Sequence, residues 1–227
     1  FYSGTGCGHV VCIDARTGQA LWRFQMSYGG VNAGVVIHDD SIIAVHGKEN
    51  VDSTIIGRMV AIKKPKSLPG LGEDILVLGK NHEIWRNNGI EAFTSTPVYR
   101  NGRVYTTIKR GELVCLDANT GEEHWVLKLS PDQIHASPTW ADGRLYVPMF
   151  NGKLFVVEDT GESAKVINEL DLGSACLAAP AVAHGRVLVQ SKRKLYCFGS
   201  KSPAPPFVVK PYCLLYTSPS PRDSIRS

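Results

Sequence analysis

The chain has 227 residues, of which 43% are hydrophobic and 20% are charged, and its formal net charge is +4. This composition is ordinary for a globular chain long enough to bury a core, and the absence of an 18-residue apolar run excludes a transmembrane helix. Residues 202–227 contribute three cations and one carboxylate, which leaves a net charge of +2 for the rest of the chain. This small charge does not indicate nucleic-acid binding.

Residues 1–24 are predicted to form half of a repeated β unit, with its third and fourth strands. Val10 to Asp14 reads as an apolar strand, Ala15 to Gly18 as a tight turn, and Trp22 belongs to the next strand. The glycine-rich stretch 4–8 faintly resembles a dinucleotide-binding loop, but it leads into a strand instead of a helix, so we interpret it as a turn. Because the chain starts inside the repeat, we expect it to be a piece of a longer protein. The absence of a leader sequence therefore says nothing about the location of the protein.

Residues 33–87 form a second, irregular copy of the unit. Between Ile62 and Trp85 it has 22 residues, where the regular copy has 8 between Leu116 and Trp125. Prolines and glycines in this insertion predict a surface loop. The segment 46–52 is also expanded and polar. Expanded loops on a repetitive scaffold often carry binding sites, but for either loop alone we favour a plain tolerated insertion.

Residues 93–128 and 135–170 are the two most regular copies. Successive copies open with a proline and continue with a glycine at intervals of 41 and 42 residues: Pro97, Pro138 and Pro180, then Gly102, Gly143 and Gly185. Each copy reads as four short strands. A period of 40–45 residues with four strands is typical of a β-propeller blade, and the amphipathic pattern of a helical repeat does not occur.

Residues 177–199 supply three strands of a fifth copy, and the propeller region is predicted to span residues 1–201. The sequence therefore predicts an all-β chain with three whole blades of four antiparallel strands and two partial blades. Residues 202–227 share nothing with the repeat, and residues 213–223 resemble the translation of a sequencing adapter. We expect this tail to be non-native and unfolded, and we exclude it from functional reasoning.

An aspartate, a glycine and a tryptophan recur around the turn after the third strand. The aspartate can accept bonds from backbone N–H groups just ahead of it, and the glycine can take a positive φ. The tryptophan is large enough to fill the gap between neighbouring sheets, and Val166 or Ile167 is expected to replace it in the fourth copy. This structural set comprises Asp14, Gly18, Trp22, Trp85, Asp117, Gly121, Trp125, Asp159 and Gly161.

The cysteines favour packing over disulfides or metal binding. Cys12, Cys115 and Cys197 occupy the same place in three copies, where the other two have Ala61 and Val156. A position that accepts all three residue types is a small buried apolar site, and equivalent positions in separate blades lie too far apart for a disulfide. The other cysteines have no CxxC partner and no zinc-like spacing.

The segments 14–22 and 117–125, Asp-Ala-x-Thr-Gly-x-x-x-Trp, resemble the tryptophan-docking repeat of the PQQ-like β-propellers. That superfamily includes quinoprotein alcohol dehydrogenases and BamB-type outer-membrane assembly lipoproteins. The resemblance covers residues 7–199 and implies a closed ring of seven or eight blades in an extracytoplasmic bacterial setting, periplasmic or secreted. With three whole blades and two partial ones, this chain is expected to hold an incomplete ring, unless it closes as four. The motif is structural and is shared by members with different functions.

No catalytic constellation is predicted. Asp14, Asp117 and Asp159 each serve their own blade and do not converge, and no nucleophile–base signature, Walker loop or metal-spaced histidine cluster occurs. The resemblance implies that dehydrogenase members use a calcium-held quinone and commonly an adjacent-cysteine disulfide, and this sequence has no adjacent cysteines. We expect a non-catalytic binding or scaffold propeller without a cofactor, with a BamB-like assembly factor as the more specific form of this expectation. The alternative is a fragment of a PQQ- and calcium-dependent dehydrogenase whose decisive residues lie outside this sequence.

Polar and basic residues mark the predicted loops between second and third strands. If the strands run from axis to rim, as the resemblance implies, these loops share one face with the connections between blades. Such a basic rim would favour a protein or an anionic ligand. Solvated charges that keep strand edges from pairing are the alternative interpretation. The candidate binding residues are His46, Lys48, Lys109, Arg110, Asn151, Lys153, Lys192 and Arg193.

Overall fold

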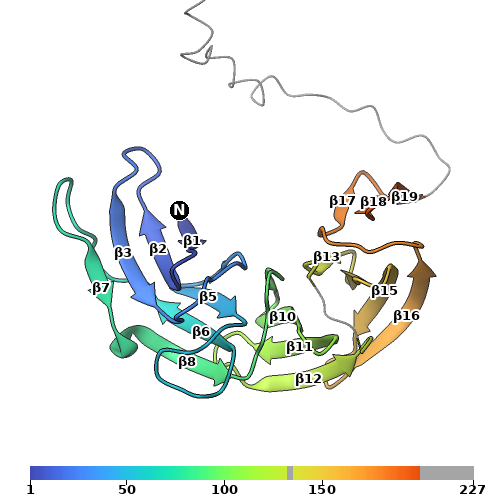
Figure 1. Ribbon diagram of the computed structural model, residues 1–227, viewed down its shortest axis with the longest axis horizontal. Helices are drawn as coiled ribbons and strands as arrows, with labels where there is room; N and C mark the ends of the chain where they lie inside the picture. Colours follow the sequence, from blue (N-terminus) through green and yellow to red (C-terminus); the bar gives the residue numbers. More distant parts are fainter. Residues whose placement is uncertain (132–134, 200–227) are drawn as a thin grey trace, which may run out of the picture.

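The computed structural model describes residues 1–131 and 135–199, so the predicted tail at 202–227 and the domain end near Lys201 lie outside the described residues. The described chain is almost entirely β, with one short 3-10 helix, η1 (Lys80–His82). Its strands form five separate sheets that follow one another along an arc (Figure 1). The prediction of an all-β chain built from small antiparallel sheets is confirmed.

Three sheets are whole four-stranded antiparallel blades, as predicted. Their first strands are short and contact one another in turn, β4 with β9 and β9 with β13, which places them nearest the axis. Blade 2 contains β4 (Val36–His38), β5 (Ser41–His46), β6 (Arg58–Lys63) and β8 (Glu83–Asn88). Blade 3 contains β9 (Val98–Arg100), β10 (Arg103–Ile108), β11 (Glu112–Asp117) and β12 (Glu123–Lys128). Blade 4 contains β13 (Thr139–Ala141), β14 (Arg144–Pro148), β15 (Lys153–Asp159) and β16 (Ala164–Asp171).

Blade 1 is larger than the predicted half blade. It consists of β1 (Tyr2–Gly4), β2 (His9–Ile13), β3 (Ala20–Gln25) and β7 (Leu76–Leu78). Tyr2 pairs with Cys12 just as Tyr105 pairs with Cys115 in blade 3, so β1 is a second strand of the unit. The glycine-rich stretch 4–8 leads from β1 into β2 as a turn.

The insertion in blade 2 is only partly the surface loop that its composition predicts. Its strand β7 crosses back to blade 1 and pairs in parallel with β3, with Trp22 opposite Leu76 and Phe24 opposite Leu78. Leu78 is 4% exposed and packs in the same apolar cluster as Trp22 and Phe24. Burial of Leu78 against blade 1 therefore gives this part of the insertion a regular structure, whereas Gly70 and Gly72 lie in its exposed remainder.

Blade 5 contains the three predicted strands, β17 (Ala181–Ala183), β18 (Arg186–Gln190) and β19 (Leu195–Gly199). The expectation that Cys197 is buried is wrong, because it is exposed on β19, an edge strand that pairs only with β18 in the described chain. The four equivalent positions in the other blades, Cys12, Ala61, Cys115 and Val156, are buried. The five described cysteines are free thiols.

The hydrophobic core lies between neighbouring blades, as four clusters. In blade 2, alternate residues point to opposite sides: Ile42 and Val60 pack toward blade 1, while Ile43 and Met59 pack toward blade 3. This two-residue alternation is the pleat of a β-strand. Because both faces are covered, β5 and β6 are buried almost throughout, and each blade is held by its neighbours.

Candidate functional site

The repeated turn aspartates bond to their own turns. The Asp14 carboxylate accepts the N–H groups of Thr17 at 2.9 Å and Arg16 at 2.8 Å, and these bonds lower its pKa. Asp117 accepts from Asn119 at 2.7 Å and Thr120 at 3.0 Å. Partial burial of Asp117 opposes ionisation, but the two N–H bonds outweigh it and lower its pKa. These carboxylates order the turns, and Asp117 also lies 3.7 Å from Nε2 of His124 on the same hairpin.

Trp85 and Trp125 each reach into the following blade. The Trp85 indole N–H donates to the Ala118 carbonyl at 2.9 Å, and its ring covers Gly121 so closely that a Cβ there would lie 2.3 Å from the ring. The Trp125 N–H donates to Asp159 at 3.1 Å. Trp22 is also buried between two blades, but blade 2 has the insertion where blade 3 has the glycine turn, and Leu78 packs beside it. The geometry of all three supports a structural role.

Asp159 makes contacts that its turn position does not predict. Besides the Gly161 N–H at 2.8 Å, its carboxylate accepts the Tyr105 hydroxyl at 2.7 Å and pairs with Arg103 at 3.0 Å. Burial opposes ionisation, but these bonds and that of Trp125 lower the pKa of Asp159. Asp159 therefore joins blade 3 to blade 4. A sequence pattern could have predicted the contact with Arg103: an arginine follows the Asn/Asp/His-Gly pair in three successive copies, at positions 103, 144 and 186.

The fourth strand of blade 4 has no tryptophan, and the expected substitutes, Val166 and Ile167, do not occupy the equivalent position. The same bulge follows this position in blades 1 to 4, but the β15–β16 hairpin has two more residues than the β11–β12 hairpin. Asn168 therefore stands opposite Val156, as Trp125 stands opposite Cys115. Val166 instead pairs with Val157, and Ile167 is 38% exposed. The sequence reasoning missed the longer hairpin because the turn motif alone does not show how far the two strands pair beyond the bulge. Next to Asn168, a groove of about 540 Å³ remains between blades 4 and 5.

His46 does not belong to an exposed face, and the prediction of a binding role there is wrong. The side chain is fully buried, with Nε2 bonded to Asn50 at 3.0 Å and Nδ1 accepting the Lys48 N–H at 3.1 Å. Burial lowers its pKa to about 4, although the Asn50 bond opposes the shift. Asn50 in turn donates to the carbonyls of Ile55 and Gly57, so His46 anchors the expanded loop.

A partly buried ion network fixes the same loop. Asp52 pairs with Arg58 at 2.5 Å and with Arg86 at 2.8 Å, and also with Lys80 from η1. Its burial opposes ionisation, but the three cations outweigh this and lower the pKa of Asp52 strongly. Arg58 is 1% exposed. Because a buried charge is costly without partners, this network serves as structural support.

The other candidate binding residues lie at the turns between second and third strands, as predicted, but several are paired. Arg110 lies 3.2 Å from Glu112, and Lys153 lies 2.6 Å from Glu169. Asn151 donates to Ser130 at 3.1 Å. These pairs make the rim less basic than the sequence implies. Exposed at the same turns are Lys109, Lys192 and Arg193, and Lys48 is half-buried.

Three of these lysines lie over phenylalanine rings that the sequence reasoning missed. Lys48 and Lys109 each place Nζ 5.9 Å from the Phe93 ring centre, and Lys192 places Nζ 5.1 Å from the Phe150 ring centre. His135 lies between the two phenylalanines, with ring centres 6.1 Å from Phe93 and 5.6 Å from Phe150. The structure thus joins residues from blades 2 to 5 into one surface.

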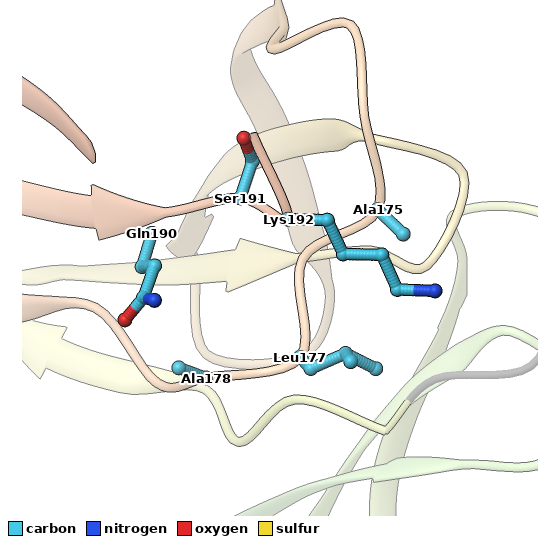
Figure 2. A pocket seen from close by; sticks show the side chains of 6 residues that line it. All are labelled: Ala175, Leu177, Ala178, Gln190, Ser191 and Lys192. Atoms are coloured by element: carbon cyan, nitrogen blue, oxygen red, sulfur yellow. The ribbon is translucent and has the colours of Figure 1, made fainter. Parts of the chain in front are cut away.

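A shallow pocket of about 220 Å³ opens beside Lys192 (Figure 2). Leu177 and Lys192 extend in the same direction from the two segments that form it. A bond from the Lys192 N–H to the Ala175 carbonyl at 2.8 Å holds these segments together, as does a bridge between Cys176 and Ser191. The lining residues are Ala175, Leu177, Ala178, Gln190, Ser191 and Lys192.

The described residues do not fit a calcium-held quinone. Calcium takes six to eight oxygen ligands, commonly from several carboxylates. Across residues 1–131 and 135–199, no group of three or more His, Cys, Asp or Glu side chains is placed to hold a metal ion. The same residues include no helix that could cross a bilayer.

Comparison with known proteins supports the fold. The family model described as "Outer membrane protein assembly factor BamB" matches residues 76–164, which run from β7 into β16. Among curated proteins, no significant match was found.

Two solved structures cover 87% of this chain. The crystal structure of BamB from Moraxella catarrhalis superposes with a TM-score of 0.58 at 13% identity, and 54% of that chain is covered. A chain in a crystal structure of the mitotic checkpoint complex gives a TM-score of 0.61 at 10% identity, with 60% of that chain covered. The chain thus spans between half and two thirds of these structures, and at such identities they show the fold alone. Together these findings show a β-propeller fold and support a repeat of the PQQ-like, BamB type, which the family model matches over residues 76–164.

Proposed function

We propose that this chain is a non-catalytic binding or scaffold propeller whose partner is a protein. One observation carries the proposal: the repeated carboxylates are used within the scaffold. Asp14 and Asp117 bond to their own turns, and Asp159 bonds to side chains of the neighbouring blade. A catalytic pair would have to face one reacting point, whereas these groups are spread along the arc.

The family match supports a more specific version, in which the protein assists outer-membrane protein assembly from the extracytoplasmic side. The support is the description of the matched family over residues 76–164. The propeller face that carries the connections between blades is the proposed contact surface, because loops on a rigid scaffold commonly carry binding residues. The same architecture also occurs in a chain of the mitotic checkpoint complex, so the proposal rests on the family match and not on the fold.

A quinone assay tests this proposal against the dehydrogenase alternative. The purified chain, incubated with PQQ and calcium, is expected to give no dye-linked alcohol oxidation and no rise in melting temperature. A ligand that bound the folded state would raise the melting temperature by mass action. Calcium-dependent dye reduction by the chain would overturn the proposal.

A further inference from the structure

We propose that an extended acidic segment of the protein partner binds along the surface formed by Lys48, Phe93, Lys109, His135, Phe150 and Lys192, here called the lysine–aromatic row. The inference rests on the proposed function and names the chemistry of the partner. These residues come from turns between second and third strands and from connections between blades. In an antiparallel four-stranded blade, those two kinds of loop lie at the same end of the strands.

The row is continuous across the blades. Phe93, on the connection into blade 3, lies under Lys48 of blade 2 and Lys109 of blade 3. His135 then joins Phe93 to Phe150, which lies under Lys192 of blade 5. Phe150 is 41% exposed, so the row reaches solvent.

The row attracts anions because its terminal lysines keep their charge available. Lys109 shares its charge with Glu91 at 3.5 Å. In contrast, neither Lys48 nor Lys192 has a carboxylate within ion-pair distance in the part of the chain that the structure describes. A lysine ammonium has three donors and remains a cation when it lies over an aromatic ring. Both ends of the row can therefore bind carboxylates.

An extended peptide suits this surface better than a nucleic acid does. Single-stranded nucleic acids bind proteins largely by stacking bases on aromatic faces. In the row, Lys48 and Lys109 lie over Phe93, and Lys192 lies over Phe150, which restricts access to those faces. The rings follow one another at 6.1 and 5.6 Å. This is close to the roughly 6.5 Å between side chains on one face of a strand, so alternate side chains of a peptide can follow the rings.

The pocket beside Lys192 provides a place for one apolar side chain of the peptide. Leu177 is 48% exposed at this pocket, and its side chain extends in the same direction as that of Lys192 (Figure 2). An apolar residue placed there would cover Leu177, while neighbouring carboxylates reach Lys192. The expected partner sequence thus alternates acidic and small polar residues and contains one aliphatic residue.

The test uses fluorescence anisotropy with the whole chain and labelled probes. The probe is a short peptide that alternates Glu and Ser around one Leu; comparison peptides replace Glu with Gln or Lys, and an oligo-dT of equal formal charge is the nucleic-acid probe. The Glu peptide is expected to bind, and the Gln and Lys peptides to bind at least tenfold more weakly. The double variant K48E/K192E should lose about tenfold in affinity, a change of about 1.4 kcal/mol.

The matched control is K66E/K165E, which changes the net charge equally at two exposed lysines away from the row. It should change the affinity by less than about twofold at physiological salt, where distant charges are screened. Phe150→Leu, which keeps the apolar bulk but removes the ring under Lys192, should also weaken binding. The melting temperature of each variant is measured as well, and affinities are compared only between variants that are folded at the assay temperature.

Three outcomes would overturn the inference: equal loss in both double variants, tighter binding of the oligo-dT, or no binding of the Glu peptide. Each of these leaves the non-catalytic function intact if the quinone assay is also negative. Calcium-dependent oxidation, in contrast, would overturn the proposed function whatever the peptide does.

Discussion

Trp125 lies buried between blades 3 and 4, with its indole N–H on Asp159. Truncating such an aromatic typically costs about 3–5 kcal/mol, a large share of an ordinary stability of about 5–15 kcal/mol. Trp125→Ala is therefore expected to lower the melting temperature sharply. Lys109→Ala and Arg110→Ala, on exposed turns, should each change the free energy of unfolding by no more than about 0.5 kcal/mol. An unchanged melting curve for Trp125→Ala with lost peptide binding would mean that the tryptophan is a binding residue.

Gly18 and Gly121 allow the tryptophan contact to be separated from backbone strain. They hold the same position in two copies of the turn, with φ values of 74° and 73°. Alanine is strained at either site, but only at Gly121 would its Cβ clash with Trp85, whereas Gly18 has open space. Gly121→Ala should therefore destabilise the chain by about 1–3 kcal/mol more than Gly18→Ala, measured by urea unfolding. Equal losses would show that Trp85 does not need this close approach.

Asp159 should make stability depend on pH. Its carboxylate has a lowered pKa in the folded state, so its contribution is present above the unfolded pKa of about 3.9 and is lost as pH falls through the lower folded pKa. Asp159→Asn should weaken the fold at neutral pH and reduce the loss of stability on acidification. Asp14→Asn is the comparison: the pKa of Asp14 is also lowered, but its carboxylate bonds only within its exposed turn, so this substitution should change the pH dependence less than Asp159→Asn does. Parallel acid-unfolding curves for wild type and Asp159→Asn would contradict this role.

Among the strands, β7 is the one whose position in the fold differs most from the position that the sequence predicts. It is a strand of the blade 2 insertion that serves as the rim of blade 1, with Leu78 buried and Val77 60% exposed. Leu78→Ala is expected to cost about 2–5 kcal/mol through the cavity it leaves, and Val77→Ala, one residue away, no more than about 0.5 kcal/mol. Chemical denaturation of both variants measures the difference. Similar small losses would mean that β7 adds little to blade 1.

The whole molecule is an arc whose two ends do not complement each other. Blade 1 holds second, third and fourth strands together with β7, and blade 5 holds first, second and third strands, so the ends overlap by two strands and not by the single one that the predicted half blade implied. At the blade 5 end, Leu195 is 68% exposed on the edge strand β19.

Open strand edges and exposed apolar surface promote association. The chain is therefore expected to self-associate, with a mass in light scattering that rises with concentration. Substituting Leu195→Lys on β19 should reduce this association, because a charge on an edge strand opposes pairing. A monodisperse monomer at all concentrations would contradict the prediction.

The sequence alone predicts the blades because their signals are local. The 41-residue interval, the Asp and Gly of each turn and the alternation within strands all act over a few residues, and they correctly indicate β5, β6, β10, β11, β14 and β15. Three whole blades and a three-stranded fifth sheet follow from the same pattern. The turn positions of Lys109 and Lys192 also follow from it.

Long-range contacts decided the rest. Leu76 pairs with Trp22 from a distant part of the chain, and His46 is buried because Asn50 folds back on it. Asn168 takes the place of a tryptophan because the strands β15 and β16 pair over a hairpin two residues longer than that of blade 3. The lysine–aromatic row depends in the same way on Phe93 and Phe150 meeting lysines of other loops. Neither composition nor spacing encodes such meetings, because they are set by how neighbouring blades pack. The fold was therefore determined by local pattern, and the candidate site by tertiary packing.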